Sequence, residues 1–177
     1  PGTGKSALAK LLPDAMEIAR GGSSAHVRYE RVEPGNNGLK MINSISNQAD
    51  YVPLAQNFHY FVLDEVDQLN KDAMSILKSV MNKMNTVWVL TTNRFIDIEA
   101  GIKDRCHCVA FNAAPVVNWL PLARRILAHA GVTGVTDAQL CAVIAPCQGS
   151  ARQITDAVIE LAVSAHRASK VGTSTVV

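Results

Sequence analysis

The first part of the chain alternates short apolar runs with polar turns, a pattern typical of helices packed on a sheet. The run 60–63 is apolar throughout and ends in Asp64-Glu65, which predicts a strand buried on both faces with carboxylates at its carboxyl end. A second buried strand is predicted over 86–92 and is followed by Asn93. The other elements predicted here are helices over 5–12, 39–49 and 70–85, an amphipathic piece over 96–103, and strands over 15–19 and 106–111. The alternating segment 26–32 is expected to be a strand or an edge hairpin. Pro13 is expected to end the first helix, and Asn70 to cap the third.

Helical spacing dominates the chain after Pro115. Apolar residues recur at intervals of three and four over 116–130, 137–145 and 151–168, and Gly or Pro residues separate these segments. We therefore expect an α/β domain over 1–113, in which a parallel sheet is flanked by helices. A small helical domain is expected over 114–170, followed by a tail or linker over 171–177.

Composition narrows the class of protein without identifying it. The chain has 177 residues, of which 48% are hydrophobic, enough for one large domain or a domain with a small appendage. The formal net charge of +2 neither requires nor excludes a nucleic-acid partner. No apolar run approaches the roughly 18 residues of a membrane span, so no membrane partner is expected. The four cysteines lack C-x-x-C spacing and are predicted to be buried, reduced thiols: Cys106, Cys108, Cys141 and Cys147.

A phosphate-binding motif opens the chain. Residues 1–6 read Pro-Gly-Thr-Gly-Lys-Ser, the back half of G-x-x-x-x-G-K-[ST]. In such a loop, backbone N–H groups and a helix N-terminus surround the β-phosphate, the lysine neutralises phosphate charge, and the serine hydroxyl ligates Mg²⁺. The nucleotide-binding residues predicted from the motif are Gly2, Thr3, Gly4, Lys5, Ser6 and Ala7. The first glycine of the motif and the strand that precedes such a loop are missing, so we expect a fragment that binds ATP weakly by itself.

The phosphate loop and the acidic strand end predict one site. Carboxyl ends of parallel strands meet at the same edge of a sheet, so Asp64 and Glu65 are expected near Lys5 and Ser6. Ser6 and Asp64 are the predicted Mg²⁺ ligands, because both offer hard oxygen donors. Glu65 is the predicted group that polarises the attacking water. Asp67 is expected to be a solvated or capping residue.

Together, these motifs resemble an AAA+ ATPase with a C-terminal helical lid. The tripeptide Asp104-Arg105-Cys106 narrows the resemblance to sliding-clamp loader subunits, which carry Ser-Arg-Cys at this place. The resemblance implies that Asn93 is sensor 1, which orients the lytic water, and that Arg105 is an arginine finger acting on the neighbouring subunit. It further implies that Arg152 is sensor 2, although Gly-Ser-Ala-Arg stands here instead of Gly-Asp-x-Arg. In this fold the missing strand would lie between those predicted over 86–92 and 106–111.

The resemblance implies a Mg²⁺-dependent ATPase subunit of a DNA sliding-clamp loader in DNA replication. Its cofactors would be ATP and Mg²⁺, and its partners other AAA+ subunits, identical or different, a sliding clamp and primer-template DNA. Arg94, Lys71 and Lys78 could face DNA, but solvated helix faces are the favoured interpretation. A cytoplasmic location is expected, or the nucleus in a eukaryote and the host cytoplasm for a phage. The alternatives are a Holliday-junction branch-migration motor, a replication initiator, or a non-hydrolysing AAA+ interaction subunit.

Overall fold

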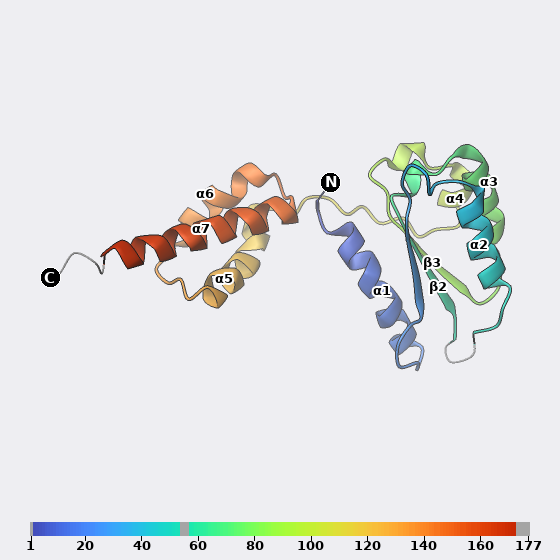
Figure 1. The fold of residues 1–177 in the computed structure, drawn as a ribbon, viewed down its shortest axis with the longest axis horizontal. Helices are drawn as coiled ribbons and strands as arrows, with labels where there is room; N and C mark the ends of the chain where they lie inside the picture. Colours follow the sequence, from blue (N-terminus) through green and yellow to red (C-terminus); the bar gives the residue numbers. More distant parts are fainter. Residues whose placement is uncertain (1, 54–56, 173–177) are drawn as a thin grey trace. The chain divides into compact units, whose positions relative to one another are not determined.

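The chain folds into two compact units in the computed structural model, which describes residues 2–53 and 57–172. One unit is Lys5–Val109, and the other combines the described residues of segments 1–4 and 110–177. Figure 1 shows both as ribbons coloured along the sequence. Each unit has a hydrophobic core of its own.

A three-stranded parallel sheet forms the centre of the Lys5–Val109 unit. Its strands lie in the order β1 (Val27–Arg31), β2 (His59–Asp64) and β3 (Thr86–Leu90). The register between β1 and β2 pairs Arg31 with Asp64. The carboxyl ends of the strands therefore meet at one edge of the sheet, and the predicted α/β fold with a parallel sheet is confirmed.

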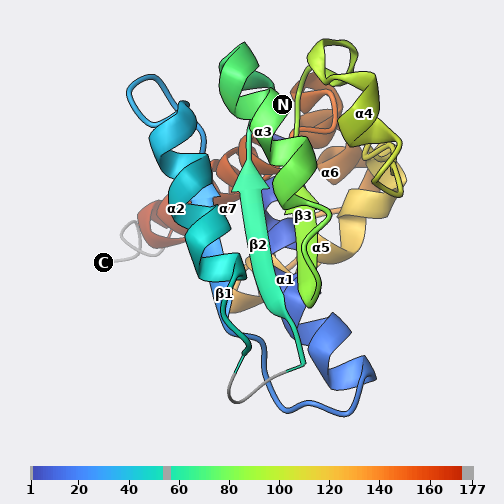
Figure 2. The same cartoon turned by 90° about the vertical axis from the view of Figure 1, so that its right-hand side faces the viewer.

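Helices cover both faces of this sheet. Figures 1 and 2 show α1 (Lys5–Ala19) on one face, and α2 (Leu39–Ala49) and α3 (Lys71–Val80) on the other. The remaining elements of the unit are the short helices η1 (Val66–Gln68), η2 (Phe95–Asp97) and α4 (Ala100–Lys103). This layering explains why all six residues of β2 are buried.

Side chains of β2 alternate between the two layers of helices. Phe61 and Leu63 belong to the core cluster that also contains Ile42 of α2 and Leu77 of α3. Tyr60, on the opposite face, donates its hydroxyl to a carboxylate of α1. The buried strand predicted over 60–63 is therefore correct, and so is the helix predicted over 39–49.

The end of the first helix was predicted wrongly. The segment 15–19, expected to be a strand, is the last part of α1, which contains Pro13. Proline removes one backbone hydrogen bond and crowds the preceding turn. Its position offsets this cost, because Ala9, Pro13 and Glu17 lie four residues apart on one buried stripe of the helix.

The third helix and the strand after it are shorter than predicted. Asn70 caps α3 as expected, since its Oδ1 accepts the Ala73 amide at 2.8 Å. However, α3 ends at Val80 rather than at residue 85. Asn85 adopts a left-handed conformation with φ of 56°, which asparagine tolerates and which turns the chain into β3. The strand ends at Leu90 and is half-buried, because β3 pairs with β2 and with no other strand among the described residues.

The strand predicted over 106–111 is absent. These residues form no regular element and are mostly exposed, Val109 by 71%. A strand is stable only where a neighbouring strand satisfies its backbone groups, and no described strand pairs with this segment. The expected burial of all four cysteines is also wrong: each is a free thiol, but Cys147 is buried while Cys108 is exposed.

The C-terminal unit is helical. Its elements are η3 (Val116–Trp119), α5 (Leu120–His129), α6 (Asp137–Ile144), η4 (Ala145–Cys147) and α7 (Ala151–Gly172). Because α7 continues to Gly172, the tail predicted over 171–177 begins too early, and 173–177 lie outside the described residues. Within the described part of the chain, no helix has the length and hydrophobicity needed to cross a membrane.

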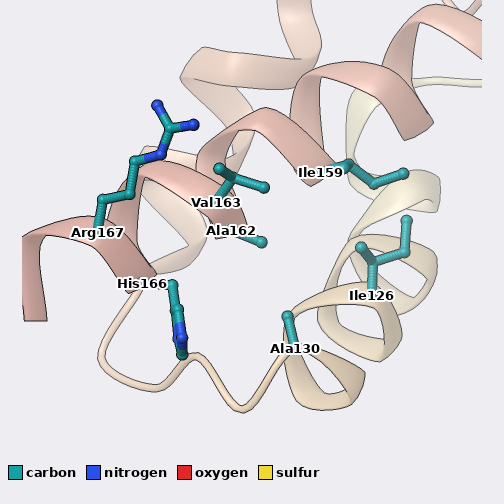
Figure 3. Close-up of a pocket in the computed structure, with 7 residues that line it drawn as sticks. All are labelled: Ile126, Ala130, Ile159, Ala162, Val163, His166 and Arg167. Atoms are coloured by element: carbon teal, nitrogen blue, oxygen red, sulfur yellow. The ribbon is translucent and has the colours of Figure 1, made fainter. Parts of the chain in front are cut away.

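An apolar groove lies between α5 and α7. Figure 3 shows side chains from both helices along it. The residues that line the groove are Ile126, Ala130, Ile159, Ala162, Val163, His166 and Arg167. Ile159 and Val163 are each 45% exposed, so this groove is open at the helical surface, and Ala162 of the hydrophobic core also lines it.

Candidate functional site

The first turn of α1 meets the carboxyl end of β2. Ser6 is the second residue of the helix, and its hydroxyl donates to Asp64 Oδ1 at 2.8 Å. Asp64 is the last residue of β2 and is 4% exposed. The structure therefore brings together the two predicted Mg²⁺ ligands, which are 58 residues apart in the sequence.

Three hydroxyl groups surround the Asp64 carboxylate. Oδ1 accepts from Thr91 as well as from Ser6, and Oδ2 accepts from the Tyr29 hydroxyl at 2.8 Å. Burial alone would raise the pKa of Asp64, but hydrogen bonds from Thr91, Ser6 and Tyr29 outweigh it and hold the pKa below its ordinary value. Burial, followed by the bond to Asp64, raises the pKa of Tyr29 to about 12. Asp64 is therefore an anion at neutral pH, lined with oxygen atoms.

Sequence reasoning missed two of these hydroxyls. Tyr29 lies in β1 and Thr91 directly follows β3, and both strands are neighbours of β2. The signal that could have found them is a polar residue near the carboxyl end of each strand that flanks the acidic one. Their pairing with Asp64 follows from the strand order, which the sequence pattern did not specify.

Glu65 leaves the strand in an unusual conformation. Its φ of 61° and ψ of 46° are left-handed, a conformation that costs free energy for a residue with a side chain. Its amide donates to Thr91 Oγ1 at 3.2 Å. One carboxylate oxygen lies 3.2 Å from Arg31 Nη2, and the other accepts Gln68 Nε2 at 2.6 Å. Arg31 and Gln68, both missed from the sequence, hold this carboxylate in place.

Asp67 links the loops that follow β2 and β3. Its Oδ1 accepts the Thr92 hydroxyl at 2.7 Å and the Asn93 amide at 3.3 Å. The expectation that Asp67 is a solvated or capping residue missed this connection. Asn93 is exposed, and within the described residues its side chain makes no hydrogen bond to Asp64 or Glu65. The structure therefore holds the Asn93 backbone near the edge of the sheet, but the side-chain amide of Asn93 makes no hydrogen bond to the carboxylates of Asp64 and Glu65.

The loop glycines adopt the conformations that glycine allows. Gly2 and Gly4 have φ of 79° and 99°. The Thr3 hydroxyl oxygen between them is buried and has no hydrogen-bond partner in the part of the chain that is described. Lys5 and Ala7 stand in the first turn of α1, which contains no acidic residue. Its free backbone N–H groups and the Lys5 ammonium make this turn suited to an anion.

Within the C-terminal unit, the loop contacts the start of α7. Gly2 O accepts the Ala151 amide at 2.8 Å, and a side chain at position 2 would overlap Ser150. Arg152, the predicted sensor 2, is the second residue of this helix and is exposed. Its side chain makes no hydrogen bond within the described residues, so its predicted role stays a prediction.

Arg105 lies outside the Asp64 cluster. Its Nε donates to Asn82 Oδ1 at 2.9 Å, and its Nη1 donates to Gly101 O at 2.6 Å. None of its hydrogen bonds within the described residues reaches Asp64 or Glu65. The side chain is exposed, which an arginine that acts on another subunit requires.

The basic residues that could face DNA differ in whether they pair with an acidic side chain. Lys78 Nζ lies 2.5 Å from Glu99 Oε2, and Arg94 lies 3.9 Å from Asp97. These acidic neighbours reduce the positive charge available to a phosphate backbone. Lys71 is exposed at the start of α3.

Comparisons with known proteins bear on the family and the fold of the chain. The model of a family described as "ATPase family associated with various cellular activities (AAA)" matches residues 1–112. No curated protein sequence matches the chain significantly. The fold is similar to that of the RuvB Holliday junction branch migration motor of Thermotoga maritima, with a TM-score of 0.68 and 17% identity, over 88% of this chain and 49% of that one. A DNA polymerase III gamma subunit-related protein from the same organism gives a TM-score of 0.41 and 14% identity, over 72% and 53%. This chain thus spans about half the length of these proteins.

Proposed function

Since the chain belongs to the AAA family of ATPases, we propose that it binds ATP with Mg²⁺ at the Asp64 cluster and hydrolyses it. The observation that carries this proposal is the 2.8 Å contact between Ser6 Oγ and Asp64 Oδ1. A serine in the first turn of a helix and a buried carboxylate at a strand end are the protein ligands that P-loop enzymes use for magnesium.

The donors of this cluster fit the metal. Mg²⁺ takes oxygen ligands and usually keeps several waters, so two protein oxygens beside substrate phosphates suffice. Ser6 and Asp64 would hold it, and the lowered pKa of Asp64 keeps that carboxylate ionised. When bound, the metal supplies charge neutralisation of the phosphate oxygens. Tyr29 and Thr91 orient the carboxylate by donating to it.

The remaining roles follow the motif. Lys5 and the loop residues Gly2, Thr3 and Gly4 contact the phosphates. Glu65 accepts a proton from the attacking water, and Arg31 and Gln68 fix the direction of its carboxylate. Asn93 orients the same water, Arg152 contacts phosphate as sensor 2, and Arg105 acts on the site of a neighbouring subunit.

We further propose that the ATPase serves a sliding-clamp loader. The tripeptide Asp104-Arg105-Cys106, which resembles the Ser-Arg-Cys of loader subunits, supports this choice. The partners are then further AAA+ subunits, a sliding clamp and primer-template DNA. A branch-migration motor is the second candidate, since its fold is similar. At 17% identity that similarity bears on the fold alone. The tripeptide is therefore the reason for ranking the clamp loader above the branch-migration motor.

The hydrolysis proposal is tested with full-length protein and its partner subunits. Glu65→Gln preserves the size of the side chain and still allows a contact with Gln68, but it removes the proposed base. We expect kcat for ATP to fall by about 10²- to 10⁴-fold while ATP still binds. Glu160→Gln makes the same substitution at an exposed position of α7 and is expected to change neither quantity. Unchanged turnover with Glu65→Gln would remove the assignment of the base.

The choice between a clamp loader and a branch-migration motor is tested by measuring which partner stimulates ATP turnover. A clamp loader is expected to hydrolyse ATP faster when clamp and primer-template DNA are added together than with either alone. A branch-migration motor responds to four-way junction DNA instead and is indifferent to the clamp. Stimulation by junction DNA alone would reverse the order of the two candidates.

A further inference from the structure

The Arg105 guanidinium is held by two groups from different elements. Asn82 belongs to the turn after α3, and Gly101 belongs to α4. Both hydrogen bonds lie inside the Lys5–Val109 unit. Arginine presents five N–H donors, and these bonds use one at Nε and one at Nη1. Among the described residues the Nη2 pair and the second Nη1 hydrogen have no acceptor, which leaves them for an acceptor on another chain.

The groups that hold Arg105 are themselves fixed. Val80, at the end of α3, and Ile102, in α4, are buried in the same core cluster, so the two elements pack together. The Lys78–Glu99 ion pair joins them again at 2.5 Å. Gly101 lies so close to Lys78 that a Cβ would be 2.9 Å from its side chain.

The Asn82 turn is also tied down. Its amide donates to Ser79 O at 3.2 Å, and Lys83 Nζ donates to Ser46 O and Ser46 Oγ at 2.8 Å. The acceptor oxygen of Asn82 therefore stands on a rigid base although the residue is exposed. An unrestrained arginine samples many rotamers, and each constraint raises the fraction of time that it spends in one orientation.

We propose that Asn82 is a positioning residue that orients Arg105 toward the phosphates of a neighbouring subunit. This inference rests on the proposed ATPase function and on the action of Arg105 in trans. In this role Asn82 contacts Arg105 and acts through it. It accepts the Nε hydrogen, restricts rotation about the end of the side chain, and leaves the terminal donors outward. Arg105 then meets the charge that spreads over the transferred phosphoryl group without first losing rotational freedom.

The test uses mixed assemblies of full-length subunits. One subunit carries Lys5→Ala, which disables its own site, together with a variant at Asn82, and its neighbour is wild type. With Asn82→Ala we expect kcat of the wild-type sites to fall about tenfold and KM for ATP to stay the same, a small part of what removal of an arginine finger costs. Asn82→Asp retains an acceptor for Nε and is expected to restore most of the rate. Ser79→Ala, at an exposed position of α3, serves as the matched control.

The possible outcomes distinguish the positioning role of Asn82 from the proposed ATPase function on which it rests. A loss with Arg105→Ala but none with Asn82→Ala overturns the positioning role alone. A faster rate with Asn82→Ala also overturns it, since Asn82 would then hold Arg105 away from its target. No loss with Arg105→Ala removes the action in trans and the positioning role together. Absence of turnover in the wild-type assembly counts against the proposed ATPase itself.

Discussion

Two carboxylates join α1 to β2, one at each end of the strand, and they are satisfied differently. Asp64 lies at the carboxyl end and accepts hydrogen bonds from three hydroxyl groups. Glu17 lies toward the amino end, is fully buried, and accepts from the Tyr60 hydroxyl at 2.6 Å and from the Asn57 amide and side chain at 2.8 Å each. Hydroxyl groups rotate and can also accept hydrogen bonds or ligate a metal, whereas a backbone amide can only donate.

The surroundings of Glu17 are closed. A side chain at Gly22 would overlap the Glu17 carboxylate, so backbone packs directly against it. Hydrogen bonds from Tyr60 and then Asn57 lower the pKa of Glu17 below its ordinary value. The pKa of Asp64 is lowered as well, so the pKa does not distinguish the two groups. The hydrogen-bond donors distinguish them: those around Glu17 suit a structural role, and those around Asp64 suit ligand binding.

Neutralising each carboxylate tests this contrast most strongly. Asp64→Asn removes the charge that would hold Mg²⁺, and we expect turnover to fall by about 10²- to 10³-fold, since metal-ion catalysis supplies several kcal/mol. Glu17→Gln makes the same change of charge at the other end of β2. Turnover per folded molecule is expected to be unchanged with Glu17→Gln, as measured with full-length protein normalised to the folded fraction. Equal losses in the two variants would contradict the division of roles.

A matched pair of tyrosine substitutions sharpens the contrast. Tyr60→Phe leaves the buried Glu17 carboxylate without one donor and should lower the free energy of unfolding by about 1–3 kcal/mol. Tyr29→Phe removes a donor from Asp64, where Ser6 and Thr91 remain, and should affect the Mg²⁺ dependence of turnover more than stability. Urea denaturation and a Mg²⁺ titration of turnover measure the two effects. The contrast fails if Tyr29→Phe proves the more destabilising of the two.

The pH dependence of stability gives the smallest effect. Burial, followed by the bonds to Asp64 and Glu17, raises the pKa of Tyr29 and Tyr60 from 10.0 to about 12 each. A pKa raised by folding contributes stability that is complete below the unfolded value and is lost as pH passes the folded value. We therefore expect the free energy of unfolding to decline between about pH 10 and 12 and the double Phe variant to decline less there. An identical alkaline slope in wild type and double variant would contradict this assignment.

At acid pH the sign is reversed. The lowered pKa values of Asp64 and Glu17 contribute stability above the unfolded carboxyl pKa, and this stability is lost as pH falls through the folded values. Both ends of β2 therefore weaken in acid. Protonation of Asp64 is expected to lower ATPase activity directly, because this carboxylate is a proposed metal ligand. Protonation of Glu17 is expected to affect stability alone.

Local pattern predicted the elements that packing did not alter. The apolar run before Asp64 predicted a strand buried on both faces, and β2 is such a strand, between two layers of helices. Asn70 capped α3 because a cap depends on the three residues after it. Prediction was wrong where distant contacts decided the outcome: α1 continues past Pro13 along a buried stripe, and 106–111 finds no described strand to pair with.

The candidate site shows the same division. Ser6, Asp64 and Glu65 were predicted because motif spacing and strand ends are local properties of the chain. Tyr29, Arg31 and Thr91 were missed, since their contacts arise from strand order and register. Gln68 was also missed, although it contacts Glu65 only three residues away, across the left-handed turn that Glu65 makes. A tyrosine within a strand has the same local appearance whether its hydroxyl meets solvent or a buried carboxylate.

The sequence by itself determined the α/β class, the start of α1 at Lys5 and the acidic end of β2, because hydrophobic period, turn chemistry and a phosphate-loop motif depend on neighbouring residues. Only the tertiary structure decided which hydroxyls surround Asp64, that Glu17 is sealed, and that Asn82 holds Arg105. Those contacts join residues far apart in the chain, and their geometry exists only once the sheet has its order and the helices lie on its faces.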